Sequence, residues 1–167
     1  MIIHLFRHGI AIDRAAPECP EDPQRFLTKR GVKRTRAAAR GLAHLGIGAE
    51  MVLSSPFLRA RETATFAMEE LGIDAPLRIT ESLLWDADPE LLRQELTLLD
   101  DKESVLCAGH APHLDLFISY ILGTPMPGTE LKKAGFAVLH SDLAEPGDGT
   151  LLALYPPRTL RTLSKGS

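Results

Sequence analysis

The chain has 167 residues, of which 44% are hydrophobic and 25% are charged, and its formal net charge is −3. Such a length and composition are typical of one globular domain, and the slightly negative charge argues against general binding to nucleic acid or to membranes. No apolar run approaches the roughly 20 residues of a membrane-spanning helix, and no basic segment typical of a secretion signal precedes the first apolar stretch. With two cysteines that are not expected to pair, Cys19 and Cys107, the sequence predicts a cytoplasmic protein.

The first strand is expected over residues 1–6, a β-branched and aromatic segment with the composition of a buried strand. It leads directly into Arg7, His8 and Gly9. In open α/β sheets the ligand lies beyond the carboxyl ends of the parallel strands, and a glycine there lets the backbone turn and approach it closely. The sequence therefore predicts a guanidinium and an imidazole at the mouth of a sheet.

Residues 10–26 are expected to form a loop broken by prolines, and loops of this length are often functional. The helices that follow carry clear start and stop signals. Thr28 is the expected N-cap of an alanine-rich helix that ends at Gly46, Gly72 ends the next helix, and Asp88 caps a third. The expected helical ranges are 29–45, 57–71, 89–99 and 113–122.

Further short apolar segments predict strands over 50–54, 77–80, 104–108, 136–140 and 150–155. Because strands and helices alternate, we expect an α/β fold of three layers, α/β/α, with a mainly parallel central sheet, helices on both faces and an antiparallel hairpin at its close. The single domain is expected to cover residues 1–157. Residues 158–167 are expected to form a C-terminal tail, either disordered or docked on the domain.

The helix expected over residues 29–45 carries six cationic side chains and no acidic one. A run of charge is usually a solvated helix face. The alternative is an electropositive surface beside the site that attracts an acidic partner, with Lys33, Arg36 and Arg40 as its candidate contacts.

Two further residues could converge with Arg7 and His8. Arg59 lies in the first turn of the second predicted helix, and His110 directly follows the fourth predicted strand. Right-handed crossovers place these ends on one edge of the sheet. Two arginines and two histidines there would form a cationic pocket that fits a dianionic phosphoryl group without magnesium, since the arginine fork matches phosphate. The sequence lacks a nucleotide-binding P-loop, zinc-ligand spacing and a serine-hydrolase elbow, and neither a metal nor a cofactor is expected.

Three segments resemble the histidine phosphatase (phosphoglycerate mutase-like) superfamily in order and spacing: Arg7-His8-Gly9, residues 55–63 and Gly109-His110. The resemblance covers nearly the whole chain. The short length and the Ser-Pro-Phe-Leu-Arg-Ala run of residues 55–60 are most similar to the SixA-type phosphohistidine phosphatases.

The resemblance implies that His8 is the nucleophile and that Arg7, Arg59 and His110 form the phosphate pocket. Neutral His8 would attack phosphorus with one ring nitrogen while the other donates to a backbone carbonyl, and the surrounding cations would disfavour its protonation. Gly9 and Asp13 are expected to contact the substrate.

The proton donor to the leaving group is open. Family members with alcohol leaving groups use a carboxylic acid after the second helix, and the resemblance implies Glu81 for that place. Asp86 and Asp88 are the alternatives, although Asp88 is better explained as a helix cap. An imidazole leaving group, with a pKa near 6.5, needs less help from an acid.

The resemblance thus implies a metal-independent phosphatase that forms a phosphohistidine intermediate, acts on a phosphohistidine-bearing protein or a phosphate ester, and is monomeric. The alternatives are a small-molecule phosphatase or mutase of the same superfamily and a non-catalytic module that binds phosphorylated residues. The chain has no room for a long insert over the site, which favours phosphate presented by another protein. Two histidines beside two arginines favour catalysis, because binding alone needs no nucleophile.

Overall fold

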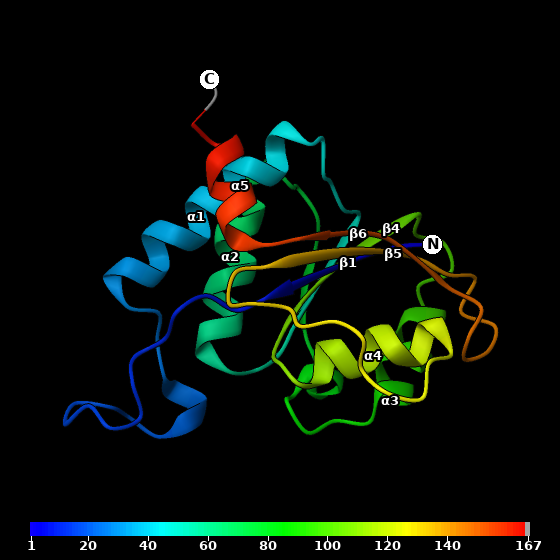
Figure 1. The fold of residues 1–167 in the computed structure, drawn as a ribbon, viewed down its shortest axis with the longest axis horizontal. Coiled ribbons are helices and arrows are strands. Elements are labelled where there is room, and N and C mark those ends of the chain that lie inside the picture. Colours follow the sequence, from blue (N-terminus) through cyan, green and yellow to red (C-terminus); the bar gives the residue numbers. More distant parts are fainter. Residues whose placement is uncertain (166–167) are drawn as a thin grey trace.

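A computed structural model describes residues 1–165, and within them the chain forms one six-stranded sheet with the strand order β3-β2-β4-β1-β5-β6 (Figure 1). Strands β1, β2, β3 and β4 are mutually parallel, whereas β5 and β6 run antiparallel to their neighbours. The mainly parallel sheet and its closing hairpin are as predicted. The strand bounds are Ile2–Arg7, Met51–Ser54, Leu77–Ile79, Ser104–Gly109, Phe136–His140 and Thr150–Tyr155.

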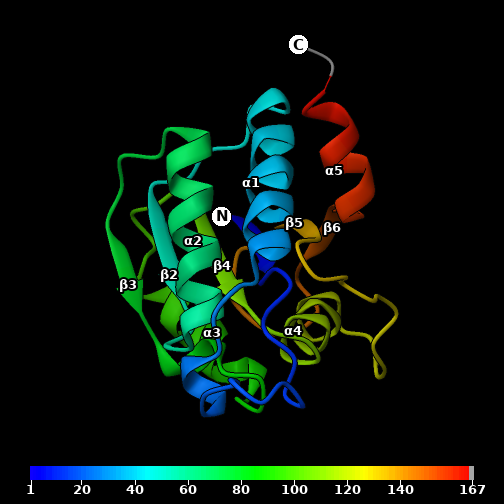
Figure 2. The ribbon, with the colours of Figure 1, turned by 90° about the vertical axis from the view of Figure 1, so that its left-hand side faces the viewer.

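Helices cover both faces of this sheet, as Figures 1 and 2 show. One face carries α1, α2 and α5, whose apolar side chains form one core cluster with the sheet. The other face carries α3 and α4, which form a second cluster. The three-layer α/β/α architecture is therefore confirmed. The helix bounds are Lys29–His44, Leu58–Leu71, Pro89–Thr97, His113–Leu122 and Pro157–Leu163 for α1 to α5, with 3₁₀ turns η1 at Asp22–Gln24 and η2 at Glu81–Leu83.

The ends of the helices follow the local signals in the sequence. The Thr28 hydroxyl accepts a hydrogen bond of 2.9 Å from the Gly31 amide and caps α1, and Asp88 caps α3 in the same way. Helix α2 ends at Gly72, whose φ of 65° lies in the left-handed region that glycine adopts without strain. These boundaries agree with the predicted ranges to within two residues.

Residues 157–163 form helix α5, which the sequence did not predict. Leu160 of α5 is fully buried, and a Cβ at Gly41 of α1 would clash with the Leu160 carbonyl, so the two helices pack backbone to backbone. The expected tail over 158–167 thus begins inside a helix that is docked on the domain. Its last two residues lie outside the described part of the chain.

The strand register places the carboxyl ends of β1, β2 and β4 side by side. In the pairing of β1 with β4, Arg7 lies opposite Gly109, and Ser54 at the end of β2 pairs with Ala108. The residues that follow these strands therefore emerge at one edge of the sheet, next to the start of α2. Among residues 1–165, no helix is long and apolar enough to cross a membrane.

Candidate active site

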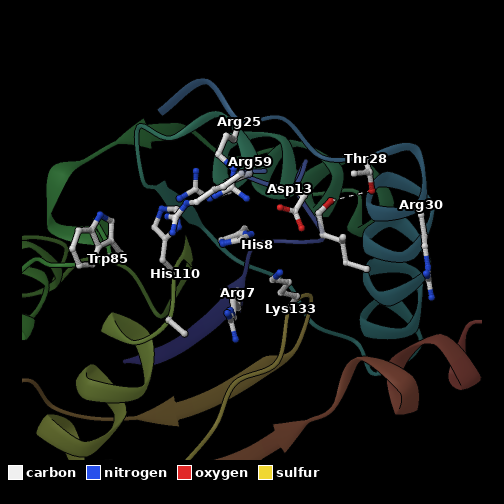
Figure 3. Close-up of a pocket in the computed structure, with 14 residues that line it drawn as sticks. Arg7, His8, Asp13, Arg25, Thr28, Arg30, Arg59, Trp85, His110 and Lys133 are labelled. Carbon is white, nitrogen blue, oxygen red and sulfur yellow. Dashed lines mark hydrogen bonds between the residues drawn. The ribbon is translucent and has the colours of Figure 1, made fainter. Parts of the chain in front are cut away.

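A cleft of about 840 Å³ opens at this edge of the sheet (Figure 3). Both predicted histidines, His8 and His110, line the cleft. Asp13 is the one acidic residue of its lining within the described chain. The remaining charged side chains of the lining are all cationic: Arg7, Arg14, Arg25, Arg30, Arg59 and Lys133. A cleft with this excess of positive charge is suited to a small polyanion.

His8 lies at the centre of the cleft and is only 8% exposed. Its Nδ1 is 2.7 Å from the Gly9 carbonyl oxygen. A carbonyl can only accept, so Nδ1 carries the proton and Nε2 keeps its lone pair. This is the tautomer that a nucleophilic histidine needs, and it matches the prediction that a backbone carbonyl orients the ring.

The surroundings keep His8 neutral. Burial lowers the pKa of His8 well below its usual 6.5, and the charges of His110, Arg59 and Arg7 lower it further. The cations lower the pKa of His8 in the predicted direction, but burial is the larger cause. The Nε2 lone pair is therefore available at neutral pH.

A single hydroxyl joins the loop that follows His8 to helix α2. Thr63 Oγ1 accepts from the Gly9 amide at 3.1 Å and donates to the Arg59 carbonyl at 2.7 Å. A Cβ at Gly9 would clash with Thr35 Oγ1, so only glycine fits at this point beside α1. Gly9 thus serves the site by close packing and by its amide.

Arg59 is held by the loop between β1 and α1. It donates to the Asp22 carbonyl oxygen at 2.7 Å and to Asp22 Oδ2 at 3.2 Å. Arg14 and Arg25 also contact the Asp22 carboxylate, each at 3.0 Å. Burial alone would raise the pKa of Asp22, but hydrogen bonds from Arg25 and Arg14 and the charge of Arg59 outweigh it and lower the pKa to about 2. Asp22 is therefore ionised and gathers three arginines at the cleft.

His110 faces His8, with ring centroids 5.0 Å apart. Its Nε2 is 2.8 Å from Ser55 Oγ, while its buried Nδ1 has no protein partner. The Phe57 ring packs edge-on against His110 and lies under the Arg59 guanidinium. Burial and the charge of Arg59 lower the pKa of His110 to about 3, so this ring is a neutral hydrogen-bonding group.

Arg7 completes the set. Its Nη1 donates to the Leu131 carbonyl at 2.6 Å, and its buried Nε has no protein partner. The structure thus brings Arg7, His8, Arg59 and His110 together around one cleft, as the sequence predicted. Asp13 lines the cleft as well, and its carboxylate accepts from the Ala15 amide at 2.8 Å.

The three candidate proton donors lie elsewhere. Glu81 begins the turn η2 with an exposed side chain and is not among the residues that line the cleft. Asp86 is exposed and also outside the lining, and Asp88 accepts from the Glu90 amide at 2.9 Å as the cap of α3. The structure does not bring any of the three to His8.

Several cleft residues escaped the sequence analysis. Arg25 comes from the long loop, Trp85 from the segment after η2, and Lys133 from the segment before β5. Asp22, in the same loop, does not line the cleft but binds Arg59. The length of the loop was a signal of function, but nothing local indicated that Asp22 would contact a residue 37 positions away. Within residues 1–165, no three His, Cys, Asp or Glu side chains gather in a way that could hold a metal ion.

Comparison with known proteins identifies the family of this chain. Residues 3–84, which include Arg7, His8 and Arg59, match the model of the histidine phosphatase superfamily (branch 1). The chain is 34% identical to an uncharacterised protein of Picosynechococcus sp. over 96% of its own length and 99% of that protein. The chain belongs to the histidine phosphatase superfamily, and its fold is phosphoglycerate mutase-like.

Within that superfamily the chain is similar to SixA. It is 29% identical to the phosphohistidine phosphatase SixA of Escherichia coli, over 96% of this chain and 97% of SixA. A solved structure of the protein histidine phosphatase SixA with tungstate has a TM-score of 0.85 and 26% identity, over 96% of this chain and 99% of that one. The superfamily and these relatives support phosphatase activity for this protein.

Proposed function

We propose that this protein is a metal-independent phosphatase that removes phosphate from phosphohistidine on a protein partner. The observation that carries the proposal is the neutral His8, with Nδ1 bonded to a carbonyl and Nε2 free, between two arginines and a second neutral histidine. The similarity to a phosphohistidine phosphatase supports the substrate class, and tungstate in a SixA structure is an oxyanion that resembles phosphate.

In the proposed reaction, Nε2 of His8 attacks phosphorus as the bond from phosphorus to the leaving nitrogen breaks. The phosphoryl group is then held on His8, and the leaving imidazole takes up a proton from solvent. In the second step water attacks phosphorus, its proton passes to solvent, and phosphate leaves neutral His8. Arg7 and Arg59 offset the charge on the equatorial oxygens, which is most of what phosphoryl transfer asks of a protein. Neutral His110 can donate a hydrogen bond to the same oxygens.

The arrangement of carboxylates supports an imidazole leaving group. The ionised Asp22 is committed to three arginines, and Asp13 is the one acid of the cleft lining within residues 1–165. A leaving group with a pKa near 6.5 needs little acid assistance, whereas an alcohol needs much more. Within residues 1–165, Glu81, Asp86 and Asp88, the carboxylates expected to protonate an alcohol leaving group, do not line the cleft.

The rim of the cleft also supports a macromolecular substrate. Trp85 at the rim is 49% exposed, and Asp13 and Arg14, which also line the cleft, are exposed as well. A phosphorylated side chain on the surface of another protein can reach such a site. A small metabolite would gain few remote contacts there to drive catalysis.

The test is turnover of three substrate types by wild type and by His8→Ala: a phosphohistidine-bearing protein, a phosphotyrosine peptide and a sugar phosphate. We expect the highest kcat/KM for phosphohistidine, transient label from ³²P substrate on His8, and no turnover by the folded variant. A clear preference for the sugar phosphate would reject the substrate class. Full activity of His8→Ala would reject the mechanism, and binding without any turnover would favour a non-catalytic module.

A further inference from the structure

The cations of helix α1 divide into two sets, and one of them is neutralised within the protein. Arg36 contacts Glu69 at 2.5 Å and Glu70 at 2.8 Å, and Arg40 contacts Glu70 at 3.2 Å, both across to α2. Arg36 and Arg40 are therefore not the free contacts for an acidic partner that the sequence suggested. They balance the acidic end of α2.

Of the remaining α1 cations, Arg34 lines a second concavity. A groove of about 470 Å³ runs between α1, the segment before β5 and α5, and five of its eight lining residues in the described chain are cationic with none acidic. We call it the basic groove and define it by Arg7, Arg34, Lys132, Lys133 and Arg161. Arg7 and Lys133 also line the cleft around His8 (Figure 3), so the groove adjoins the cleft.

Most of this charge has no partner in the protein. Across residues 1–165, neither Arg34, Lys133 nor Arg161 forms an ion pair, and only Lys132 is paired, with the neighbouring Glu130. Burial lowers the pKa of Arg161, and the nearby charges of Arg34, Arg158 and Arg30 lower it further. Like charges so placed repel one another unless an anion lies between them.

Hydrogen bonds and helix packing hold the walls of the basic groove in place. Arg7 holds the Leu131 carbonyl, the Asp115 carboxylate accepts from the Leu131 amide at 2.8 Å, and the Ala134 amide donates to the Arg7 carbonyl at 3.1 Å. These bonds bracket Lys132 and Lys133. On the opposite wall, the close packing of α5 on α1 places Arg161 beside Arg34.

We infer that the basic groove binds an acidic segment of the protein substrate while the phosphorylated histidine occupies the adjoining cleft. This inference rests on the proposed function for the identity of the substrate. The cations come from β1, α1, α5 and the segment before β5, and a chain carrying several carboxylates can contact all of them at once. A second phosphate on a small substrate would satisfy only part of the groove. Contacts of this kind lower KM and raise the association rate more than they change kcat.

The test uses two phosphohistidine peptides that differ only in four following residues, four glutamates in one and four serines in the other. Each is assayed with wild type, with Arg34→Ala/Arg161→Ala and with the control Arg36→Ala/Arg40→Ala. The control removes the same charge from the same side of the molecule, but outside the groove. Binding of the unphosphorylated forms of both peptides is measured in parallel by fluorescence anisotropy at 50 and 300 mM NaCl.

We expect wild type to have a lower KM for the glutamate peptide than for the serine peptide. In the groove variant, KM should rise about tenfold for the glutamate peptide and change little for the serine peptide. Wild type should also bind the unphosphorylated glutamate peptide more tightly at low salt, and the control should keep both preferences. Equal binding and KM for the two peptides, or a preference that survives in the groove variant, would overturn the inference. So would turnover of a small bisphosphate that depends on Arg34 and Arg161 while neither peptide is preferred.

The binding measurement separates this inference from the proposed function. If neither peptide is hydrolysed but p-nitrophenyl phosphate is, the phosphohistidine assignment fails. The anisotropy difference between groove variant and control still decides whether the groove binds acidic chains.

Discussion

Thr63→Val is the substitution that most directly tests how the loop after His8, the proposed nucleophile, is positioned. Thr63 is fully buried and its hydroxyl is the acceptor for the Gly9 amide. Valine has the same shape but no hydroxyl, so the buried amide is left without a partner at a cost of about 1–3 kcal/mol. For a domain of this size, each kcal/mol lowers Tm by roughly 2–4 °C, which gives an expected fall of about 2–12 °C.

The same change should reduce catalysis. The Gly9 carbonyl orients His8, and the Thr63 hydroxyl contacts the Arg59 carbonyl. The substitution therefore removes a support from both His8 and Arg59, the residues that we propose contact the phosphoryl group. Displacements well under 1 Å at reacting atoms are costly, and we expect kcat/KM for p-nitrophenyl phosphate to fall about tenfold or more. The assays are thermal unfolding by circular dichroism and steady-state kinetics with the small substrate, which avoids contributions from partner docking.

Thr35→Val is the matched control. Thr35 is also fully buried and lies beside Gly9, but its hydroxyl has no protein hydrogen-bond partner. Removing that hydroxyl should leave Tm unchanged or raise it, because an unpaired buried polar group is removed. A Thr63→Val variant with wild-type Tm and activity would refute the positioning role, as would a Thr35→Val variant with equal losses.

Three further outcomes are expected. Activity should survive EDTA and be inhibited by vanadate, because arginines and histidines line the proposed phosphate pocket; loss in EDTA that magnesium restores would contradict this. Burial lowers the pKa of His4 and His113 to about 4 and that of His110 to about 3. Below pH 6.5 the unfolded chain therefore binds more protons than the folded chain, and the free energy of unfolding should fall as pH drops from 6.5 to about 4. Equal urea midpoints at about pH 7 and pH 5 would contradict this. Because Glu81 is exposed outside the cleft, Glu81→Gln should change kcat/KM by less than about twofold, and a tenfold loss on p-nitrophenyl phosphate alone would restore Glu81 as a proton donor.

Sequence reasoning succeeded where the cause of a structure is local. Thr28 caps α1 and Gly72 ends α2 because a side-chain oxygen and a left-handed residue act within one turn of the helix. Helix α5 was missed because seven residues are too short to be helical by themselves. Burial of Leu160 against α1 stabilises that helix, and this contact is invisible in the local pattern.

In the site, too, the residues placed by strand order were predictable, and those placed by the folding of a loop or turn were not. Arg7, His8 and His110 were predictable because they end neighbouring parallel strands, and topology alone brings such ends together. Glu81 was chosen by its place in the chain, but the turn η2 leaves its side chain in solvent. Asp22 was overlooked because its partners depend on how a long loop folds back over the start of α2.

That loop has a consequence for changing what the protein acts on. Arg25 donates two hydrogen bonds to the Ile12 carbonyl, and the Ile12 amide bonds the Phe26 carbonyl, so the loop is closed on itself as a compact unit. Through Asp22 the same unit holds Arg59 from a distant helix. Exchanging this loop for that of a relative would thus also change the support of Arg59, the arginine that we propose binds phosphate. A transplanted loop would need a carboxylate in the place of Asp22 to hold Arg59. Without it, we expect the exchange to reduce turnover.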